Sequence, residues 1–409
     1  MDRIDRQKYL NWMIKWKDQQ IIKVISGVRR CGKSTLFDIF CDDLISTGVD
    51  AKQIIRLNFE DVENEELLSY KALYSYVINL LVPNKINYIF LDEIQHVDQY
   101  ERVVDSLFLK KNCDVYITGS NAWFMSGELA TLLSGRYVEL RMLPLSFLEF
   151  YMYHSQVDKA DVKEQFNRYL EVGSFPYVSR YDLDKDAAKE YLRDIYNTVL
   201  LKDIVKRLSI SDVTALENVA KYVFHNIGNR VSPAKISNTL KSAGKSTDQK
   251  TVDRYLRGLT DSLMMYEAKR YNIKGRQFLT TQSKYYTVDI ALRNNLVRGK
   301  DSDIGHIIEN IVYLELLRRG CDVYVGQEGS DSEIDFVANR KNETIYIQVA
   351  ATTLDDDVLK RELAPLKKVR DNHPKFLLTL DDVFANVGYE GIQKRNLIGW
   401  LLSDLYMNQ

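Results

Sequence analysis

The first 145 residues alternate short apolar runs with stretches of helical periodicity. The apolar runs predict five strands, near residues 21–26, 54–59, 88–92, 115–119 and 137–141. Regular alternation of strands and helices is typical of a parallel sheet that carries helices on both faces. We therefore expect an α/β fold with a parallel sheet in this part of the chain.

The pattern becomes helical after Pro144, and we expect residues 145–207 to form a helical lid. Beyond the lid come three helical stretches and then two strand-like runs, at residues 212–228, 231–240, 249–263, 264–271 and 277–281. The second helical stretch has Ser232 as a cap and Pro233 at its first helical position. Three helices followed by a hairpin predict a winged-helix domain.

The carboxy-terminal segment has a third pattern, a helix followed by strands, at residues 304–319, 322–325, 333–338 and 344–350. This pattern predicts a small α/β domain. We therefore expect three domains: the sheet with its lid at 1–207, the winged helix at 208–298, and the small α/β domain at 299–409.

The connection between the first strand and the first helix has the form of a phosphate-binding loop, G-x-x-x-x-G-K-[ST]. The loop consists of Gly27, Val28, Arg29, Arg30, Cys31, Gly32, Lys33, Ser34 and Thr35. We expect both glycines to adopt positive φ and to bring backbone N–H groups close to phosphate oxygens. Lys33 would reach the β- and γ-phosphates, and the Ser34 hydroxyl would bind Mg²⁺. The sequence therefore predicts that ATP and Mg²⁺ bind here, at the amino terminus of a helix.

The strand near residues 88–92 ends in two carboxylates, Asp92 and Glu93, about 60 residues after the loop. We expect Asp92 to bind Mg²⁺ together with Ser34, and Glu93 to polarise the attacking water. An Asp-Glu pair after a strand is also common in ordinary polar turns. The phosphate-binding loop upstream favours the catalytic interpretation.

Ser120 and Asn121 follow the next strand, and either could sense the γ-phosphate or orient the water, or form a simple capping turn. Carboxyl ends of parallel strands point at the ligand crevice, which favours the first interpretation. Arg136 comes shortly afterwards as a candidate arginine finger, with a plain surface arginine as the alternative.

The expected winged-helix segment is basic, with 11 Lys/Arg and 4 Asp/Glu between Arg230 and Arg276. Four cations lie on or before its third helix and are candidate DNA contacts, namely Lys245, Lys250, Arg254 and Arg257. The alternatives are a solvated basic face or a surface that binds a protein partner.

Asp335 lies on the second strand of the carboxy-terminal segment and Glu309 on its helix, an arrangement that resembles the core of PD-(D/E)xK nucleases. In those enzymes carboxylates bind Mg²⁺ and a lysine positions the nucleophile. The (D/E)-x-K positions are occupied here by Gln348, Val349 and Ala350, so the lysine is missing. We therefore expect a nuclease-like fold that does not cleave; Asp335 could equally be a buried structural acid.

Composition adds few constraints. The net charge is −1, so a nucleic-acid site would have to be local. The four cysteines are scattered, which argues against a disulfide framework and favours a reducing compartment. The amino terminus lacks the apolar core of a signal peptide, and no apolar run approaches the length of a membrane span. We expect a cytoplasmic protein without a membrane segment.

The chain as a whole resembles the prokaryotic family of AAA-type ATPases that carry a C-terminal nuclease-like domain of unknown function. The motifs that carry the resemblance run in order along nearly the whole chain: IIKVISGVRRCGKSTL, YIFLDEIQHVDQYE, VYITGSNAWFMSGELATLLSGRY, VGSFP, YYTVDIALRN, EIDFVA and IYIQVA. The resemblance implies ATP binding at residues 27–35 and 92–93.

Three functions remain open on this basis. The first is an Mg²⁺-dependent ATPase that acts on DNA, in which an arginine finger supplied by a neighbouring copy would require a homo-oligomer. The second is a nucleotide-dependent regulatory switch that binds a protein partner. The third is an ATP-gated nuclease.

Overall fold

The computed structural model describes residues 3–122, 133, 135–156, 160–245, 247–297, 304–329 and 332–403. It forms two compact units. The first comprises Met1–Pro144 with Asp261–Leu263, and the second Leu145–Thr260 with Met264–Gln409. None of the helices within the described ranges is long and apolar enough to span a membrane.

The first unit alternates strands and helices as its hydrophobic pattern predicts, and each of the five expected strands is present with its ends within two residues of expectation. The main elements are α1 (Gln7–Trp16), β1 (Ile22–Ser26), α2 (Lys33–Ser46), β2 (Ile54–Asn58), α3 (Tyr70–Leu80), β3 (Asn87–Asp92), α4 (Tyr100–Phe108), β4 (Cys113–Gly119) and β5 (Tyr137–Arg141). Short 3₁₀ turns are η1 (Ala51–Gln53), η2 (Val62–Leu67) and η3 (Ile94–His96).

The five strands form a single parallel sheet in the order β2-β3-β4-β1-β5. Because all strands run in the same direction, their carboxyl ends lie at one edge of the sheet. The phosphate-binding loop follows β1 at this edge. The loops after β3 and β4 reach the same edge, so the topology brings the polar strand ends towards the loop.

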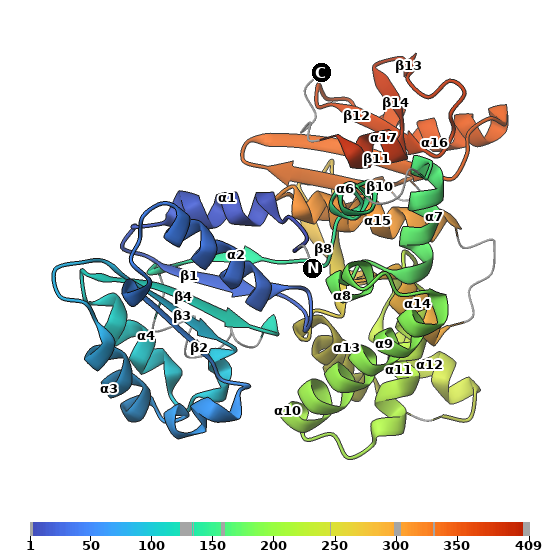
Figure 1. Cartoon of the computed structure of the whole chain (residues 1–409). Helices are drawn as coiled ribbons and strands as arrows, with labels where there is room; N and C mark the ends of the chain where they lie inside the picture. The colour runs from blue at the N-terminus through green and yellow to red at the C-terminus, as the bar shows by residue number, and fades with distance from the viewer. Residues whose placement is uncertain are drawn as a thin grey trace. The chain divides into compact units, whose positions relative to one another are not determined.

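Helices cover both faces of this sheet (Figure 1). On one face α2 places Phe37 and Phe40 edge-on against Phe90 of β3, with ring centroids 5.0 and 6.0 Å apart. On the other face Val77 of α3 and Val104 of α4 belong to a core that includes the alternate residues of β1, β3 and β4. Alternating side chains of the central strands are therefore buried on both sides, which explains why these strands are apolar throughout.

The second unit begins with helices and continues into a mixed region. Its helices are α6 (Phe147–His154), α7 (Val162–Val172), α8 (Pro176–Arg180), α9 (Lys185–Thr198), the π-helix η5 (Val199–Val205), α10 (Lys206–Leu208), α11 (Val213–His225), α12 (Pro233–Ser242), α13 (Gln249–Asp261), α14 (Ile290–Leu296), α15 (Ile304–Arg318), α16 (Asp356–Lys368) and α17 (Leu397–Leu402). Its strands are β6 (Arg230–Val231), β7 (Met265–Asn272), β8 (Gln277–Thr287), β9 (Asp322–Glu328), β10 (Ser332–Arg340), β11 (Glu343–Ala350), β12 (Lys375–Thr379), β13 (Gly388–Tyr389) and β14 (Ile392–Asn396).

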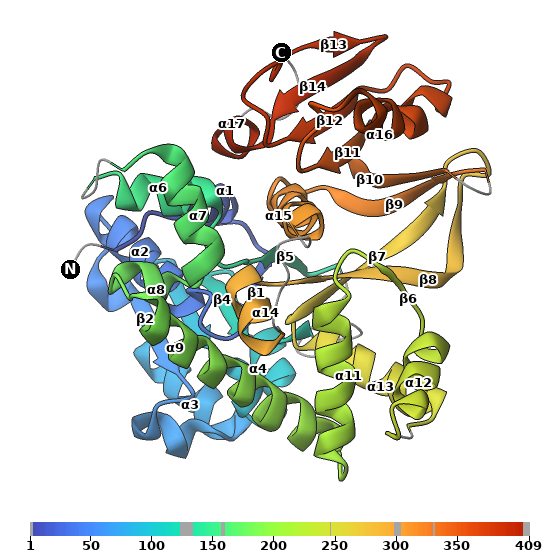
Figure 2. The same cartoon turned by 90° about the vertical axis from the view of Figure 1, so that its right-hand side faces the viewer.

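One nine-stranded sheet runs through this unit in the order β13-β14-β12-β11-β10-β9-β7-β8-β6 (Figure 2). The hairpin β7–β8 follows α11, α12 and α13, and β6 pairs with β8. The hairpin joins the carboxy-terminal strands because β7 pairs with β9 through residues 270–272 and 325–327. The expected boundaries at residues 207 and 298 thus do not separate compact units, and a division into three domains stays a prediction.

The strand β10 contains a bulge that turns Asp335 out of the regular alternation. Ile334 and Val337 both belong to the core beneath α16 although they are three residues apart. Between them, Phe336 packs against Tyr286 of β8 and Asp335 faces Lys284 of the same strand. Bulges of this kind re-aim a side chain that a regular strand would point elsewhere.

Candidate nucleotide-binding site

The phosphate-binding loop needs glycine at two positions for different reasons. Gly32 caps α2 with φ 105°, a conformation that favours glycine, as expected. Gly27 does not have positive φ, so that part of the expectation is wrong. A Cβ on Gly27 would instead lie 2.4 Å from the Met142 carbonyl oxygen and 2.8 Å from Cys31 Sγ. Glycine is therefore required at residue 27 because the chain just after β5 passes too close to the loop for a side chain.

Lys33 is the first residue of α2, and its side chain is buried beneath the loop. Its Nζ donates hydrogen bonds to the Gly27 carbonyl at 3.0 Å and to Ser120 Oγ at 2.9 Å. It also lies 3.3 Å from Glu93 Oε1. The lysine of the loop thus meets residues that follow β3 and β4, as the parallel topology predicts.

Glu93 is buried and firmly held. Its backbone adopts a left-handed conformation with φ 53°, and its N–H donates to Thr118 Oγ1 at 2.8 Å. The carboxylate accepts hydrogen bonds from Ser120 Oγ and, at 2.5 Å, from Gln95 Nε2. Burial alone would raise the pKa of Glu93, but the Lys33 ammonium and these hydrogen bonds lower it to about 2. The acid is therefore ionised throughout the neutral range.

Asp92 has an oxygen that suits a metal ion. Its Oδ1 accepts a hydrogen bond from Thr118 Oγ1 at 2.5 Å, whereas its buried Oδ2 accepts none. Burial raises the pKa of Asp92, and the hydroxyls of Ser34 and Thr118 oppose this effect. A buried carboxylate oxygen without a hydrogen bond is costly unless a cation meets it. Asp92 and the nearby Ser34 hydroxyl, both oxygen donors, therefore fit Mg²⁺.

Ser120 and Asn121 leave β4 at the same edge of the sheet. Ser120 is buried and joins Lys33 to Glu93 by hydrogen bonds to both. Asn121 follows it directly and is half-buried. Ser120 thus contacts two residues of the site, and a sensing role for Ser120 or Asn121 stays a prediction.

Arg136 lies at the opposite edge of the sheet. Its carbonyl accepts a hydrogen bond from the N–H of Ile22 at 2.9 Å, at the start of β1, whereas the loop follows the end of that strand. The length of β1 separates the two by about 13 Å. Arg136 pairs with Asp105, and its guanidinium lies 5.7 Å from the Phe108 ring centroid. Arg136 is thus not part of its own chain's phosphate site, and action on a neighbouring copy stays a prediction.

Two features of the site were missed by sequence reasoning. Arg6 is buried and donates from its guanidinium to the carbonyls of Cys31 at 3.1 Å and Leu143 at 2.7 Å, so it braces the loop. Glu60, which follows β2 at the carboxyl edge, groups with Glu93 and His96, their ligand atoms within 4.8 Å of one another. The sequence offered one signal for Glu60, its position directly after a predicted strand. It offered none for Arg6, because the contacts of Arg6 exist only once the loop has folded.

The DNA-binding candidates lie in the second unit. Lys250, Arg254 and Arg257 are exposed on α13, while Val252 and Leu256 of the same helix are buried. Arg254 donates to the Leu208 carbonyl. Arg257 pairs with Asp253 at 2.7 Å on the same helix. The exposed face of α13 therefore carries three of the four predicted cations.

The fourth cation, Lys245, precedes α13 and donates to Asn218 Oδ1 at 2.9 Å. It is exposed like the other three. A DNA contact for any of the four stays a prediction.

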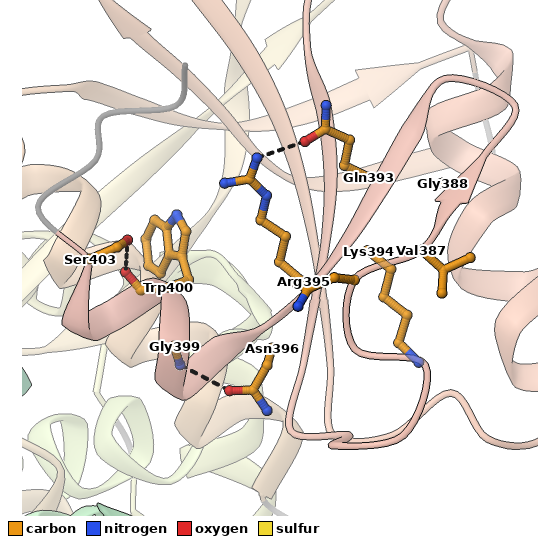
Figure 3. A pocket seen from close by; sticks show the side chains of 10 residues that line it. Val387, Gly388, Gln393, Lys394, Arg395, Asn396, Gly399, Trp400 and Ser403 are labelled. Atoms are coloured by element: carbon orange, nitrogen blue, oxygen red, sulfur yellow. Dashed lines mark hydrogen bonds between the residues drawn. The ribbon is translucent and has the colours of Figure 1, made fainter. Parts of the chain in front are cut away.

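The second unit also has a hollow of about 540 Å³ near the carboxyl end of the described chain (Figure 3). The polar groups there largely bind one another. Arg395 donates to Gln393 Oε1 at 2.8 Å, and the Gly399 N–H donates to Asn396 Oδ1 at 2.9 Å. These satisfied pairs give the hollow no convergent reactive group.

The strand order, the phosphate-binding loop and the paired acids define an AAA-type P-loop ATPase domain, and residues 19–151 match the family model of an AAA domain, AAA_14. Residues 163–303 match a domain of unknown function, DUF8612. An uncharacterized protein of Haemophilus influenzae is 38% identical over 403 residues, which cover 98% of each chain. The uncharacterized protein MJ1544 of Methanocaldococcus jannaschii is 30% identical and is covered over 83% of its length. The chain belongs to the same family as these two proteins.

Among solved structures, the Walker-type ATPase PABY2304 of Pyrococcus abyssi matches 72% of this chain and 96% of its own, with 13% identity and a TM-score of 0.49. AMPPCP-bound DnaA of Aquifex aeolicus matches 62% of this chain and 86% of its own, with 13% identity and a TM-score of 0.30.

Proposed function

We propose that the first unit binds ATP with Mg²⁺ at residues 27–35 and hydrolyses the nucleotide with Glu93 as the acid that polarises water. The observation that carries this proposal is the direct contact among Lys33, Glu93 and Ser120, next to a buried Asp92 oxygen that accepts no hydrogen bond. These groups come from three loops, and their common location at the carboxyl edge suits a single reacting phosphate.

Each residue has a role that follows from its chemistry. Lys33 supplies an ammonium group for the phosphates, and Ser34 and Asp92 would hold Mg²⁺, which neutralises phosphate charge when bound. Glu93 is strongly ionised, so it orients and polarises water through its negative charge. Since Lys33 pairs with Glu93, the lysine must exchange this partner for phosphate oxygens when nucleotide binds.

We further propose that hydrolysis is completed by a second copy of the chain and coupled to DNA. Arg136 lies at the edge of the sheet opposite its own loop, which suits a residue that reaches a neighbour's nucleotide. The exposed cations of α13 suit the phosphate backbone of DNA. The element order α11-β6-α12-α13-β7-β8 supports a winged helix, in which the third helix enters the major groove.

The test is the rate of Mg²⁺-dependent ATP hydrolysis by the full chain, with and without duplex DNA at low salt. Lys33→Ala should abolish nucleotide binding, and Glu93→Gln should bind nucleotide but lose turnover. Glu93→Gln turnover equal to wild type would overturn the assignment of the acid. If duplex DNA neither binds nor changes the rate, the coupling to DNA is wrong.

A further inference from the structure

Three aromatic side chains gather near the turn of the hairpin β7–β8, where β8, β7 and β9 lie side by side (Figure 2). Tyr271 of β7 lies directly opposite Phe278 of β8, and their ring centroids are 5.5 Å apart. Tyr324 of β9 completes the cluster, with its ring centroid 5.0 Å from that of Phe278 and 6.0 Å from that of Tyr271. We call these three residues the aromatic platform. Its members come from two segments that the sequence pattern assigns to different domains.

Phe278 is the exposed member of the aromatic platform. It is 55% exposed, whereas Tyr271 and Tyr324 are half-buried. The two tyrosines pack against the core beneath α16, which includes Ile334 and Val337. Phe278 therefore rests on rings that are themselves anchored, and it keeps apolar surface in contact with solvent. A flat partner that stacks on such a ring buries this apolar surface.

The hairpin that carries the platform is braced near its turn. β7 pairs with β9 as well as with β8, so it is supported on both sides. Just beyond β7, the Ile273 N–H donates to the Gln327 carbonyl at 3.0 Å. Within the turn, the Gly275 N–H donates to Asn272 Oδ1 at 2.7 Å. Phe278 is therefore held in place before any ligand binds, which lowers the entropy cost of binding.

The hairpin is cationic around the platform. Residues 268–284 contain five Lys/Arg and no Asp/Glu, in a chain whose net charge is −1. Lys274 and Arg276 lie in the turn and are exposed, and neither forms an ion pair with a residue in the described part of the chain. β9 contributes the acids Asp322 and Glu328, so the positive charge belongs to the hairpin, which carries the exposed ring of the platform. Cations without an acidic partner are available to bind a phosphate backbone.

An exposed ring beside unpartnered cations suits a nucleic-acid strand whose bases are unpaired. Such bases stack on aromatic side chains through their flat faces, while cations follow the backbone. In a duplex these faces are covered by neighbouring base pairs, and only the base edges are open in the grooves. A neutral protein partner could cover the ring, but it would gain nothing from the cations. The combination of ring and charge therefore favours a single strand.

We propose that the aromatic platform binds single-stranded DNA, with Phe278 stacked on an unpaired base and with Lys274 and Arg276 in contact with the flanking phosphates. The choice of DNA rests on the proposed function of α13, which directly precedes β7. The platform lies about 20 Å along β7 from Met265, where that strand begins. The two surfaces therefore contact different stretches of one DNA molecule. The preferred substrate is a junction, with its duplex on α13 and its unpaired strand on the platform.

The experiment measures the affinity of the full chain for three probes by fluorescence anisotropy. The first is a blunt duplex, the second is the same duplex with a thymidine extension of about 10 nucleotides, and the third has an abasic extension of equal length. The last two probes carry the same charge and differ only in their bases. The wild type should bind the thymidine probe about fivefold or more tightly than the abasic probe, because only the former can stack on Phe278.

Three variants test the ring itself. Phe278→Ala should lose the preference for thymidine over abasic DNA and should bind the blunt duplex like the wild type. Phe278→Trp should keep the preference, and its added fluorescence should be quenched by the thymidine probe but not by the abasic probe. Phe384→Ala is the matched control, because Phe384 is 67% exposed in the connection between β12 and β13, at the other end of the sheet. It should keep the wild-type preference.

Failure of the platform and failure of the coupling to duplex DNA give different results. A wild type that binds the blunt duplex but does not distinguish thymidine from abasic DNA would overturn the platform alone. A wild type that prefers thymidine DNA without binding the blunt duplex would support the platform and remove the duplex contact of α13. Binding of none of the three probes would overturn both proposals. An equal loss of preference in Phe278→Ala and Phe384→Ala would also overturn the platform.

Discussion

Lys33 Nζ lies 3.3 Å from Glu93 Oε1, so the lysine that would hold phosphate is paired with the acid that would polarise water. Ser120 Oγ bridges the two, accepting from Lys33 and donating to Glu93. Both charged groups are buried, and a buried charge that loses its partner strongly destabilises the folded state. Nucleotide binding must therefore supply Lys33 with new partners as it separates the pair.

The first prediction follows from this competition. Glu93→Gln removes the charge that holds Lys33, so we expect ADP to bind up to about tenfold more tightly, a gain of about 1.4 kcal/mol. Hydrolysis should fall by about 100-fold or more, because water is no longer polarised. Titration with a fluorescent ADP analogue and steady-state turnover give the two values. Glu66→Gln, an exposed acid of the same unit, should change neither; weaker ADP binding in Glu93→Gln would contradict the competition.

The second prediction concerns the space around Gly27. In Gly27→Ala the added Cβ would lie 2.4 Å from the Met142 carbonyl oxygen, so the loop must shift and nucleotide affinity should drop at least tenfold. Gly48→Ala is the control, because Gly48 has φ +96° with open space around it. That variant should lose about 1 kcal/mol of stability through backbone strain and bind nucleotide normally. Equal nucleotide affinities in Gly27→Ala and Gly48→Ala would show that the close packing of the loop at Gly27 is not needed for nucleotide binding.

Much of the first unit could be predicted because its central strands β1, β3 and β4 are buried throughout and are followed by polar residues. The meeting of Lys33 with Glu93 follows from parallel strands, whose carboxyl ends share an edge. Their pairing with each other could not be predicted, since it depends on side-chain positions within a few tenths of an ångström. The expected positive φ of Gly27 was wrong, because the close approach to residue 142 that requires a glycine there leaves no mark in the local sequence.

The second unit was less predictable for a related reason. The hydrophobic pattern predicts the strands that carry Asp335 and Gln348. Lys284, in contrast, belongs to a hairpin that the same pattern assigns to a different domain. Only the pairing of β7 with β9 joins the two segments. Motif reasoning looks for the lysine two residues after Gln348, and a lysine supplied by another strand lies outside such a pattern.

The third prediction tests whether Arg136 acts on a neighbouring copy. Arg136→Ala and Lys33→Ala should each be inactive alone, one lacking the finger and the other lacking nucleotide binding. A mixture of the two should recover part of the wild-type ATPase rate, because a mixed assembly can join an intact loop to an intact arginine. Arg141→Ala, an exposed arginine of the same strand region, should hydrolyse ATP normally. An inactive mixture of two folded variants that do assemble would contradict action between copies.

The fourth prediction concerns the exposed cations of α13. Lys250→Ala and Arg257→Ala should each weaken duplex binding and reduce the slope of log affinity against log salt by about one. Lys221→Ala removes a cation that pairs with Glu217 on α11 and should leave the slope unchanged. Fluorescence anisotropy over a range of salt concentrations measures the slopes. Identical slopes in all proteins would place the DNA contact elsewhere or remove it.

The fifth prediction uses Asp381, a buried acid of the second unit that lies outside the nucleotide-binding site. Burial alone would raise its pKa, but Lys394 and the hydroxyls of Thr352 and Thr353 lower it to about 2 from 3.8. A lowered pKa stabilises the folded state above pH 3.8, and this contribution is lost as the pH falls towards 2. The shift corresponds to about 2 kcal/mol.

Asp381→Asn should therefore be less stable than the wild type at pH 5, and the difference should shrink as the pH approaches 3. Urea denaturation followed by circular dichroism at both pH values measures this difference in the free energy of unfolding. Asp357→Asn changes an aspartate whose side chain is 95% exposed and should track the wild type at each pH. If the difference between Asp381→Asn and the wild type stays constant over this range, ionisation of Asp381 does not stabilise the fold. The pair with Lys394 would then contribute nothing to stability that depends on the charge of Asp381.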